Sequence, residues 1–195
     1  VRIFSRNLDN TTHMFPDIVS AAQKLKVKSA ILDGEAIAFN PKTGKFLSFQ
    51  GTVQRKIKHG VGEKAKEIPL KVFVFDILYL NGKSLLNKPF KERRQELEKL
   101  LDGKDSNTER LNSAKSRGTE SAEKTIFLTK QKIVTETKEF DKFFKEAMSE
   151  ELEGLMAKKL DAVYQAGARN FHGVKYKAGM KSELADTIDC VVLGY

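Results

Sequence analysis

Apolar residues recur along this chain at two spacings, which predict strands interspersed with helices. Alternating or continuous short apolar runs predict strands in "VRIFSR", "SAILDGEAIAFN", "KVFVFDILYL", "TIFLTKQKIV", "EGLMAKK", "GVKYK" and "DTIDCVVLGY". Apolar residues three and four apart predict helices in "PDIVSAAQKLK", "PFKERRQELEKLL" and "TKEFDKFFKEAMSE". This order predicts an α+β fold with antiparallel or mixed β-sheets flanked by helices.

Turn signals separate the predicted elements. Asn81-Gly82 ends the longest apolar run and predicts a tight hairpin. Residues 103–124 are polar, lack aromatic side chains and show little periodicity, so we expect an exposed loop inserted within a single domain that spans residues 1–195. The chain contains neither G-x-G-x-x-G nor G-x-x-x-x-G-K-[ST], so nothing in it resembles an alternating βαβ nucleotide fold.

Composition adds a preference for an anionic partner. The 195 residues carry a formal net charge of +9, which suits nucleic acid, nucleotide phosphates or a membrane surface. The only cysteine, Cys190, excludes a disulfide within the chain and is expected to be a buried structural thiol. No apolar stretch approaches the ~18 residues of a membrane span, and no secretion signal opens the chain, so we expect an intracellular protein.

Several charged residues stand inside the predicted strands. Glu153 and Lys158 fall on opposite faces of "EGLMAKK", whereas Lys175 and Lys177 share one face of "GVKYK". Each alone has an ordinary structural explanation, and solvent-facing strand residues are the default for charged side chains.

A second group of strand residues has the same two interpretations. Asp33 and Glu35 share a strand face, and Phe75 lies in "FVFD", where an aromatic ring is more often core than ligand platform. Taken together, acids suit Mg²⁺ or ribose hydroxyls, an aromatic ring suits a base, and lysines and arginines suit a triphosphate. The combination predicts a nucleotide site.

The motifs "IFSRN", "ILDGEAIAF", "VFVFDILYLNGKSLL", "EGLMAK" and "GVKYK", in this order, resemble those of the ATP-dependent DNA ligases. This family belongs to the covalent nucleotidyltransferases, which have an ATP-grasp-like fold and include RNA ligases and mRNA capping enzymes. The resemblance extends from Arg2 to the last residue, and residues 49–58 resemble the family's basic segment. It implies a partial adenylation domain.

The resemblance also implies roles for individual residues. Glu35 would bind ribose or Mg²⁺, Phe75 would stack on adenine, and Glu153 would assist metal binding. Arg6 and Arg169 would contact the nucleotide. Lys158 and Lys175 would contact the α-phosphate, and Lys177 would support them.

Two departures from the family pattern matter. The family's nucleophile is the lysine of a K-x-D-G motif, and this sequence contains none, since Ile31 and Leu100 precede its two Asp-Gly pairs. We therefore expect a fragment that lacks the upstream motif and the OB-fold domain, and that does not adenylate itself. His172-Gly173 also stands where the family usually has Trp before the Lys-x-Lys strand.

The implied function is nick joining in duplex DNA, through enzyme-AMP and DNA-AMP, in replication, repair or recombination. Expected ligands are ATP and Mg²⁺, and the expected partner is nicked DNA. We expect a monomer without membrane attachment, cytoplasmic in a prokaryote or nuclear in a eukaryote. The alternatives are an RNA ligase, a capping guanylyltransferase, or a non-catalytic nucleic-acid-binding module. Residues 103–124 could instead contact DNA or a partner.

Overall fold

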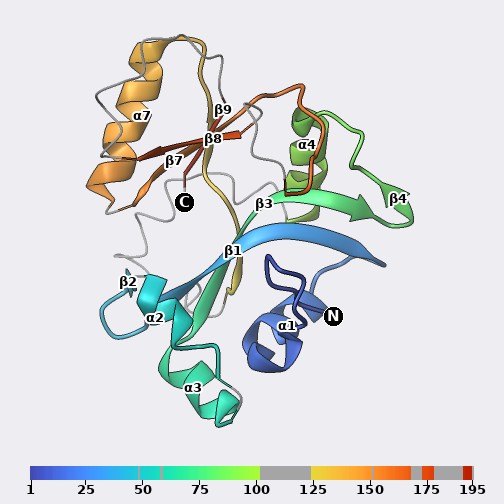
Figure 1. Ribbon diagram of the computed structural model, residues 1–195, viewed down its shortest axis with the longest axis vertical. Helices are drawn as coiled ribbons and strands as arrows, with labels where there is room; N and C mark the ends of the chain where they lie inside the picture. The colour runs from blue at the N-terminus through green and yellow to red at the C-terminus, as the bar shows by residue number, and fades with distance from the viewer. Residues whose placement is uncertain are drawn as a thin grey trace. The chain divides into compact units, whose positions relative to one another are not determined.

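The computed structural model describes residues 1–47, 49–57, 59–101, 124–150, 152–167, 173–177 and 191–194. Figure 1 shows the elements in chain order: η1 (Thr12–Met14), α1 (Pro16–Gln23), β1 (Ala30–Asn40), β2 (Lys45–Phe46), α2 (Phe49–Val53), α3 (Val61–Glu67), β3 (Leu70–Leu80), β4 (Lys83–Ser84), α4 (Phe90–Leu100), β5 (Ile126–Leu128), β6 (Gln131–Ile133), α7 (Thr137–Ser149), β7 (Gly154–Lys158), β8 (Gly173–Lys177) and β9 (Val191–Gly194). The predicted α+β class is confirmed. No helix in the described ranges is long and apolar enough to cross a bilayer.

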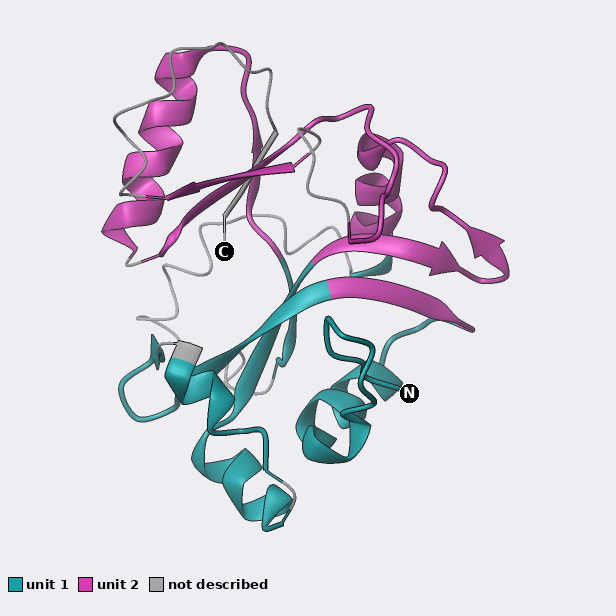
Figure 2. Cartoon of the chain, in the orientation of Figure 1, with its two compact units in different colours: residues 1–27, 34–74, 100–128 teal, residues 28–33, 75–99, 129–195 magenta. Residues whose placement is uncertain are grey.

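The chain divides into two compact units, coloured separately in Figure 2. Unit 1 comprises residues 1–27, 34–74 and 100–128, and unit 2 comprises residues 28–33, 75–99 and 129–195. Strands β1 and β3 each contribute residues to both units.

Unit 1 forms around the β1 and β3 segments that belong to it. Its core consists of residues from α1, β1 and β3 and the preceding loops: Phe15, Ile18, Ala38, Ile68 and Leu70. β2 pairs antiparallel with β1, and β5 pairs with β3 in parallel, so the sheet is mixed as predicted. Gly34 lets the strands approach closely, because a Cβ there would lie 2.8 Å from the Phe73 carbonyl oxygen.

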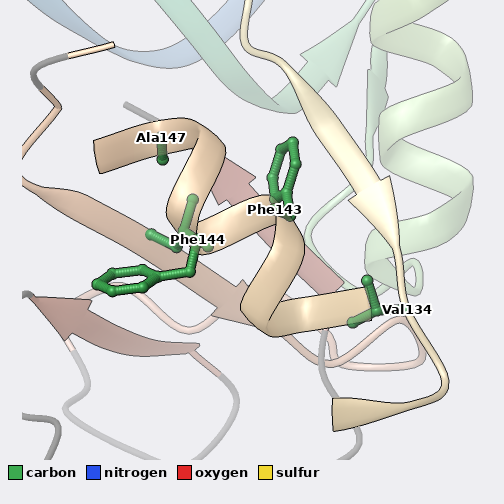
Figure 3. Close-up of a cluster of buried hydrophobic side chains, with 5 residues drawn as sticks. Val134, Phe143, Phe144 and Ala147 are labelled. Carbon is green, nitrogen blue, oxygen red and sulfur yellow. The ribbon is translucent and has the colours of Figure 1, made fainter. Parts of the chain in front are cut away.

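Unit 2 contains a second sheet with strand order β6-β9-β7-β8 in the described residues. α7 packs on this sheet, and its buried side chains Phe143, Phe144 and Ala147 form the core cluster shown in Figure 3 together with Val134 and with Leu155 of β7. Phe140 and Met148 are half-buried against the same cluster, so the predicted inward face of α7 is confirmed.

The predicted hairpin at Asn81-Gly82 is also confirmed. β3 and β4 pair antiparallel through Leu80 and Lys83. Asn81 and Gly82 both have positive φ, 47° and 91°, as a two-residue hairpin of matching twist requires. The Asn81 side chain accepts hydrogen bonds from two backbone amides, at Lys28 and Ser29, which ties the hairpin to the start of β1.

The prediction of a strand at "VRIFSR" was wrong. The segment forms only a single bridge, between Phe4 and Asn10. Polar side chains explain the difference, since the Ser5 hydroxyl oxygen accepts bonds from the Asn7 and Asp9 amides and donates to the Asp9 carboxylate. Such local bonds compete with a β-ladder.

The prediction of one strand at "TIFLTKQKIV" was also wrong. β5 belongs to unit 1 and pairs with β3, whereas β6 belongs to unit 2 and pairs with β9. Between them, the Thr129 carbonyl accepts a hydrogen bond from the Arg94 guanidinium instead of from a neighbouring strand. Helices α2 and α3 were not predicted. Residues 103–123, Arg169 and Cys190 lie outside the described residues.

Candidate functional site

The predicted site residues fall in both units. Arg6 and Glu35 belong to unit 1, and both are exposed. Unit 2 contains the larger set, which comprises Phe75, Glu153, Lys158, Lys175 and Lys177. The geometry of this larger set is described below.

Strands β7 and β8 position the acid and the lysines of unit 2. They pair antiparallel, with Gly154 opposite Lys177, Met156 opposite Lys175 and Lys158 opposite Gly173. Lys175 and Lys177 share the exposed face of β8, as predicted. The two strands place Lys177 beside Glu153 at one end and Lys158 at the other.

Glu153 forms an ion pair with Lys177. Its Oε2 lies 3.0 Å from the Lys177 Nζ, and both side chains are exposed. Gly154 makes this approach possible, because its φ is +156° and a Cβ there would lie 2.1 Å from the Tyr176 carbonyl oxygen. A glycine is therefore required directly beside the acid.

Lys158 is held in a different environment from the other two lysines. Its Nζ lies 3.6 Å from Asp76 Oδ2, 4.7 Å from the ring centre of Phe75 and 4.9 Å from that of Phe90. Burial lowers the pKa of Lys158, while Asp76 and Asp33 raise it and Arg93 lowers it further. The ammonium is thus largely desolvated beside the aromatic ring predicted to hold the base.

Asp76 and Arg93 form a buried pair next to Lys158. The guanidinium binds both carboxylate oxygens, with Nε 2.8 Å from Oδ1 and Nη2 3.0 Å from Oδ2. Arg93 Nη1 also donates to the carbonyls of Lys88 and Ala162. Two-point binding of this kind fixes both distance and orientation.

Tyr164 completes the cluster. Its hydroxyl donates a 3.0 Å hydrogen bond to Asp33 Oδ2, and the Arg93 guanidinium lies 5.8 Å from its ring centre. Burial, together with the negative charge and the hydrogen bond of Asp33, raises the pKa of Tyr164 to about 12. The phenol therefore keeps its proton at physiological pH.

Sequence reasoning gave no site role to Asp76, Phe90, Arg93 or Tyr164. One available signal was the face of α4: Phe90, Arg93, Arg94 and Leu97 follow the spacing of an apolar stripe, and all four are buried. Arginines on a core-facing stripe need buried partners.

No group of three or more His, Cys, Asp or Glu side chains in the described part of the chain could hold a metal by itself. Mg²⁺ is usually bound through one or two carboxylates together with substrate phosphates. Glu35, in unit 1, and Glu153, in unit 2, are both exposed, and each is by itself a candidate for that mode through the family motifs.

Comparison with known proteins identifies the family of this chain. Residues 1–177 match the family described as ATP dependent DNA ligase domain. The chain is 48% identical over 196 residues to a probable DNA ligase of Dictyoglomus turgidum, and 38% identical over 196 residues to DNA ligase 2 of Thermofilum pendens. Each alignment covers all of this chain and 30% of the relative, so the chain spans under a third of these relatives' length.

Solved structures show the same fold. A mycobacterial DNA ligase D complexed with ATP and MES has a TM-score of 0.60 at 22% identity, over 91% of this chain and 47% of that one. The ligase domain of M. tuberculosis LigD also has a TM-score of 0.60, at 23% identity, over 90% of this chain and 46% of that one. Through its family match and its relatives, this chain belongs to the ATP-dependent DNA ligase domain family.

Proposed function

We propose that residues 1–195 form part of the adenylation domain of an ATP-dependent DNA ligase, and that the longer protein joins nicks in duplex DNA. The observation that supports the proposal is that, in unit 2, Lys158 contacts the Phe75 ring, Lys175 and Lys177 share the exposed face of β8, and Lys177 pairs with Glu153. An aromatic ring, a set of cations and an exposed acid are the groups that a Mg²⁺-bound nucleotide requires.

In this proposal each residue has a distinct task. Phe75 stacks on adenine, and Lys175 and Lys177 contact the phosphates from the exposed face of β8. Lys158 supplies a third cation, at the α-phosphate. Glu153, which pairs with Lys177, would help to hold Mg²⁺, and the metal would supply charge neutralisation at the phosphate oxygens.

By resemblance to the family motifs, we also propose that Arg6 contacts the nucleotide and that Glu35 binds ribose or the metal. Arg169 takes a nucleotide-contacting role by resemblance alone. The reaction of the longer protein would proceed in three displacements: a lysine attacks the α-phosphorus of ATP and releases pyrophosphate, AMP passes to a DNA 5′-phosphate, and the 3′-hydroxyl displaces AMP to close the nick.

ATP binding to the 195-residue chain, measured by isothermal titration with Mg²⁺, tests the phosphate-binding role. Lys177→Ala should weaken binding by about tenfold, the expected effect of losing one charge-assisted hydrogen bond. Lys138→Ala, which removes an exposed lysine of α7, is the matched control and should leave the affinity unchanged. Equal affinities for wild type and Lys177→Ala would contradict the assigned role.

DNA binding gives an independent test. The net charge of +9 predicts that affinity for nicked duplex falls steeply with salt, because lysine–phosphate contacts release counterions. An affinity that stays flat as salt rises would refute electrostatic binding. With α-labelled ATP and Mg²⁺, the chain itself should acquire no stable covalent label, since it contains no K-x-D-G sequence.

Glutamate-to-glutamine substitutions separate the enzyme from a simple binding module. In a longer chain that includes a K-x-D-G segment, Glu35→Gln and Glu153→Gln should abolish most nick joining if these acids hold Mg²⁺ or ribose. Binding to DNA should survive or tighten, because a negative charge is removed. Unchanged nick joining would overturn both assignments.

A further inference from the structure

The Asp76 carboxylate forms ion pairs with two cations, Arg93 and Lys158. Asp76 and Arg93 are 1% and 3% exposed, and Lys158 approaches the same carboxylate at Oδ2. Asp76 Oδ1 also accepts a 2.9 Å bond from the Ile77 amide. The Ile77 amide and the Arg93 guanidinium thus hold the Asp76 carboxylate in place without Lys158. The position of the carboxylate therefore does not depend on Lys158.

Arg93 in turn connects the segments that surround Lys158. From α4 it reaches Asp76 on β3 and the Ala162 carbonyl, four residues beyond Lys158. The same segment after β7 receives backbone bonds from α4, where the Phe90 amide donates to Ala162 and the Lys91 amide donates to Leu160. The Arg93 guanidinium therefore joins α4, β3 and the segment after β7 by hydrogen bonds close to the Lys158 ammonium.

Stability alone does not account for this arrangement. A buried ion pair is often no more stable than well-packed apolar side chains of similar volume, and here a second cation is desolvated beside it. Phe75 and Asp76 are adjacent in β3, so one strand supplies both the ring and the carboxylate that Lys158 contacts. Such preorganised charge is costly in a core and useful where a negative phosphate must be bound.

We propose that Asp76 and Arg93 are positioning residues for Lys158: Asp76 holds the Lys158 ammonium beside the Phe75 ring, and Arg93 holds Asp76. The role of Lys158 at the phosphate rests on the proposed function, whereas its positioning by Asp76 is a property of the chain alone. The groups that act on the ammonium are Asp76, Asp33 and Arg93, and the Tyr164 hydroxyl binds Asp33.

The pH dependence of acetic anhydride labelling, followed lysine by lysine by mass spectrometry, tests the positioning. Asp76→Asn keeps the shape but removes the charge, so the pKa of Lys158 should fall below its wild-type value. Arg93→Gln should raise the pKa of Lys158 above its wild-type value, because Asp76 then has Lys158 as its nearest cation. Circular dichroism and thermal melting establish that each variant is folded.

The opposite signs distinguish positioning from a merely structural role. If either substitution only loosened the fold, the pKa of Lys158 would move toward the ordinary lysine value in both variants. Arg93→Lys is the second variant for the case in which the others do not fold. A lysine cannot bind both carboxylate oxygens, so it leaves Oδ2 to Lys158 and should also raise the pKa. An unchanged Lys158 profile in the folded variants overturns the proposal.

ATP affinity provides the link to function. Asp76→Asn and Lys158→Met should each weaken Mg²⁺-ATP binding by about tenfold, and the double variant should be no weaker than either, because the two residues act as a unit. Additive losses would contradict the coupling. If the wild-type chain binds no ATP, the proposed function fails for this chain, while the labelling profiles still decide the positioning.

Discussion

Unit 1 buries Arg55 and unit 2 buries Arg93 and Arg94, and Arg55 and Arg93 are satisfied to very different degrees. In unit 1, Arg55 is 0% exposed, and its Nη2 binds Asp17 at 2.8 Å, but Nε and Nη1 find no hydrogen-bond partner among the described residues. In unit 2, Arg93 binds both oxygens of Asp76 and two backbone carbonyls. The partner acids differ too, since Asp17 is 21% exposed and Asp76 is 1% exposed.

This difference separates an arginine used for packing from one used for position. Arg55 lies over the Phe15 ring and forms one ion pair, with the partly exposed Asp17. Water can therefore hydrate the Asp17 carboxylate if the arginine is removed. The Asp76 carboxylate cannot be hydrated in the same way, because it is buried beside two cations, Arg93 and Lys158. The surroundings of Arg93 are over-determined, as a preorganised site requires.

Removing the two arginines should give the largest contrast. Arg93→Met leaves a buried carboxylate with only Lys158 nearby, so we expect a loss of roughly 3–5 kcal/mol in the free energy of unfolding. Arg55→Met should cost less, roughly 1–3 kcal/mol, because Asp17 can be hydrated and the methionine keeps much of the packing. Urea denaturation of both variants measures the difference. A larger cost for Arg55→Met would reverse the comparison.

Two glycines beside acids give the next largest effect. Gly154→Ala places a Cβ 2.1 Å from a backbone oxygen at a φ of +156°, whereas Gly34→Ala meets one at 2.8 Å. Overpacking costs roughly 1–3 kcal/mol, and a strained backbone adds about as much, so Gly154→Ala should lose roughly 2–6 kcal/mol and Gly34→Ala about half of that. Thermal melts rank the two, and equal melting temperatures would show that β7 and β8 separate easily.

The sequence predicted those parts of the molecule in which local pattern and packing agree. The Asn81-Gly82 hairpin and the inward face of α7 follow directly from turn chemistry and helical spacing. "TIFLTKQKIV" has a strand pattern throughout, yet the two halves pair in different sheets, and no local feature of the segment reveals a change of partner.

The candidate site was predictable only in part, for the same reason. Lys175 and Lys177 share an exposed face because strand alternation requires it. The contacts of Lys158 with Asp76 and Phe90 depend on tertiary packing of α4, β3 and β7, which periodicity does not contain. Arg93 stood within a run of charged residues that alone indicates a solvated helix face.

Tyr164→Phe tests the edge of the unit 2 cluster and should have a smaller effect. It removes the hydrogen bond to Asp33, which is worth about 1 kcal/mol. The folded-state pKa of about 12 lies above the ordinary value of 10.0, so this stabilisation is complete below pH 10 and is lost as pH rises toward 12. The chain has four tyrosines and no tryptophan, so ultraviolet titration should show one late tyrosinate that disappears in Tyr164→Phe. Its persistence would refute the assignment.

Lys71→Met should have the smallest effect, and it returns the comparison to unit 1. Lys71 is buried, and its Nζ lies 5.4 Å from the ring centres of both Phe39 and Phe127. Burial lowers the pKa of Lys71, so the unfolded chain binds the proton more tightly, and the folded state bears a cost at neutral pH that shrinks as pH rises toward 10.5. A methionine avoids that cost and fills similar space but loses the hydrogen bond from Lys71 to the Lys124 carbonyl oxygen, so the variant should be about as stable as wild type, within about 1 kcal/mol. Urea denaturation at neutral and alkaline pH should show that the free energy of unfolding of wild type increases relative to that of the variant as pH rises. A large loss in Lys71→Met would mean that unit 1, like unit 2, depends on its buried cation, and the distinction between the two units would fail.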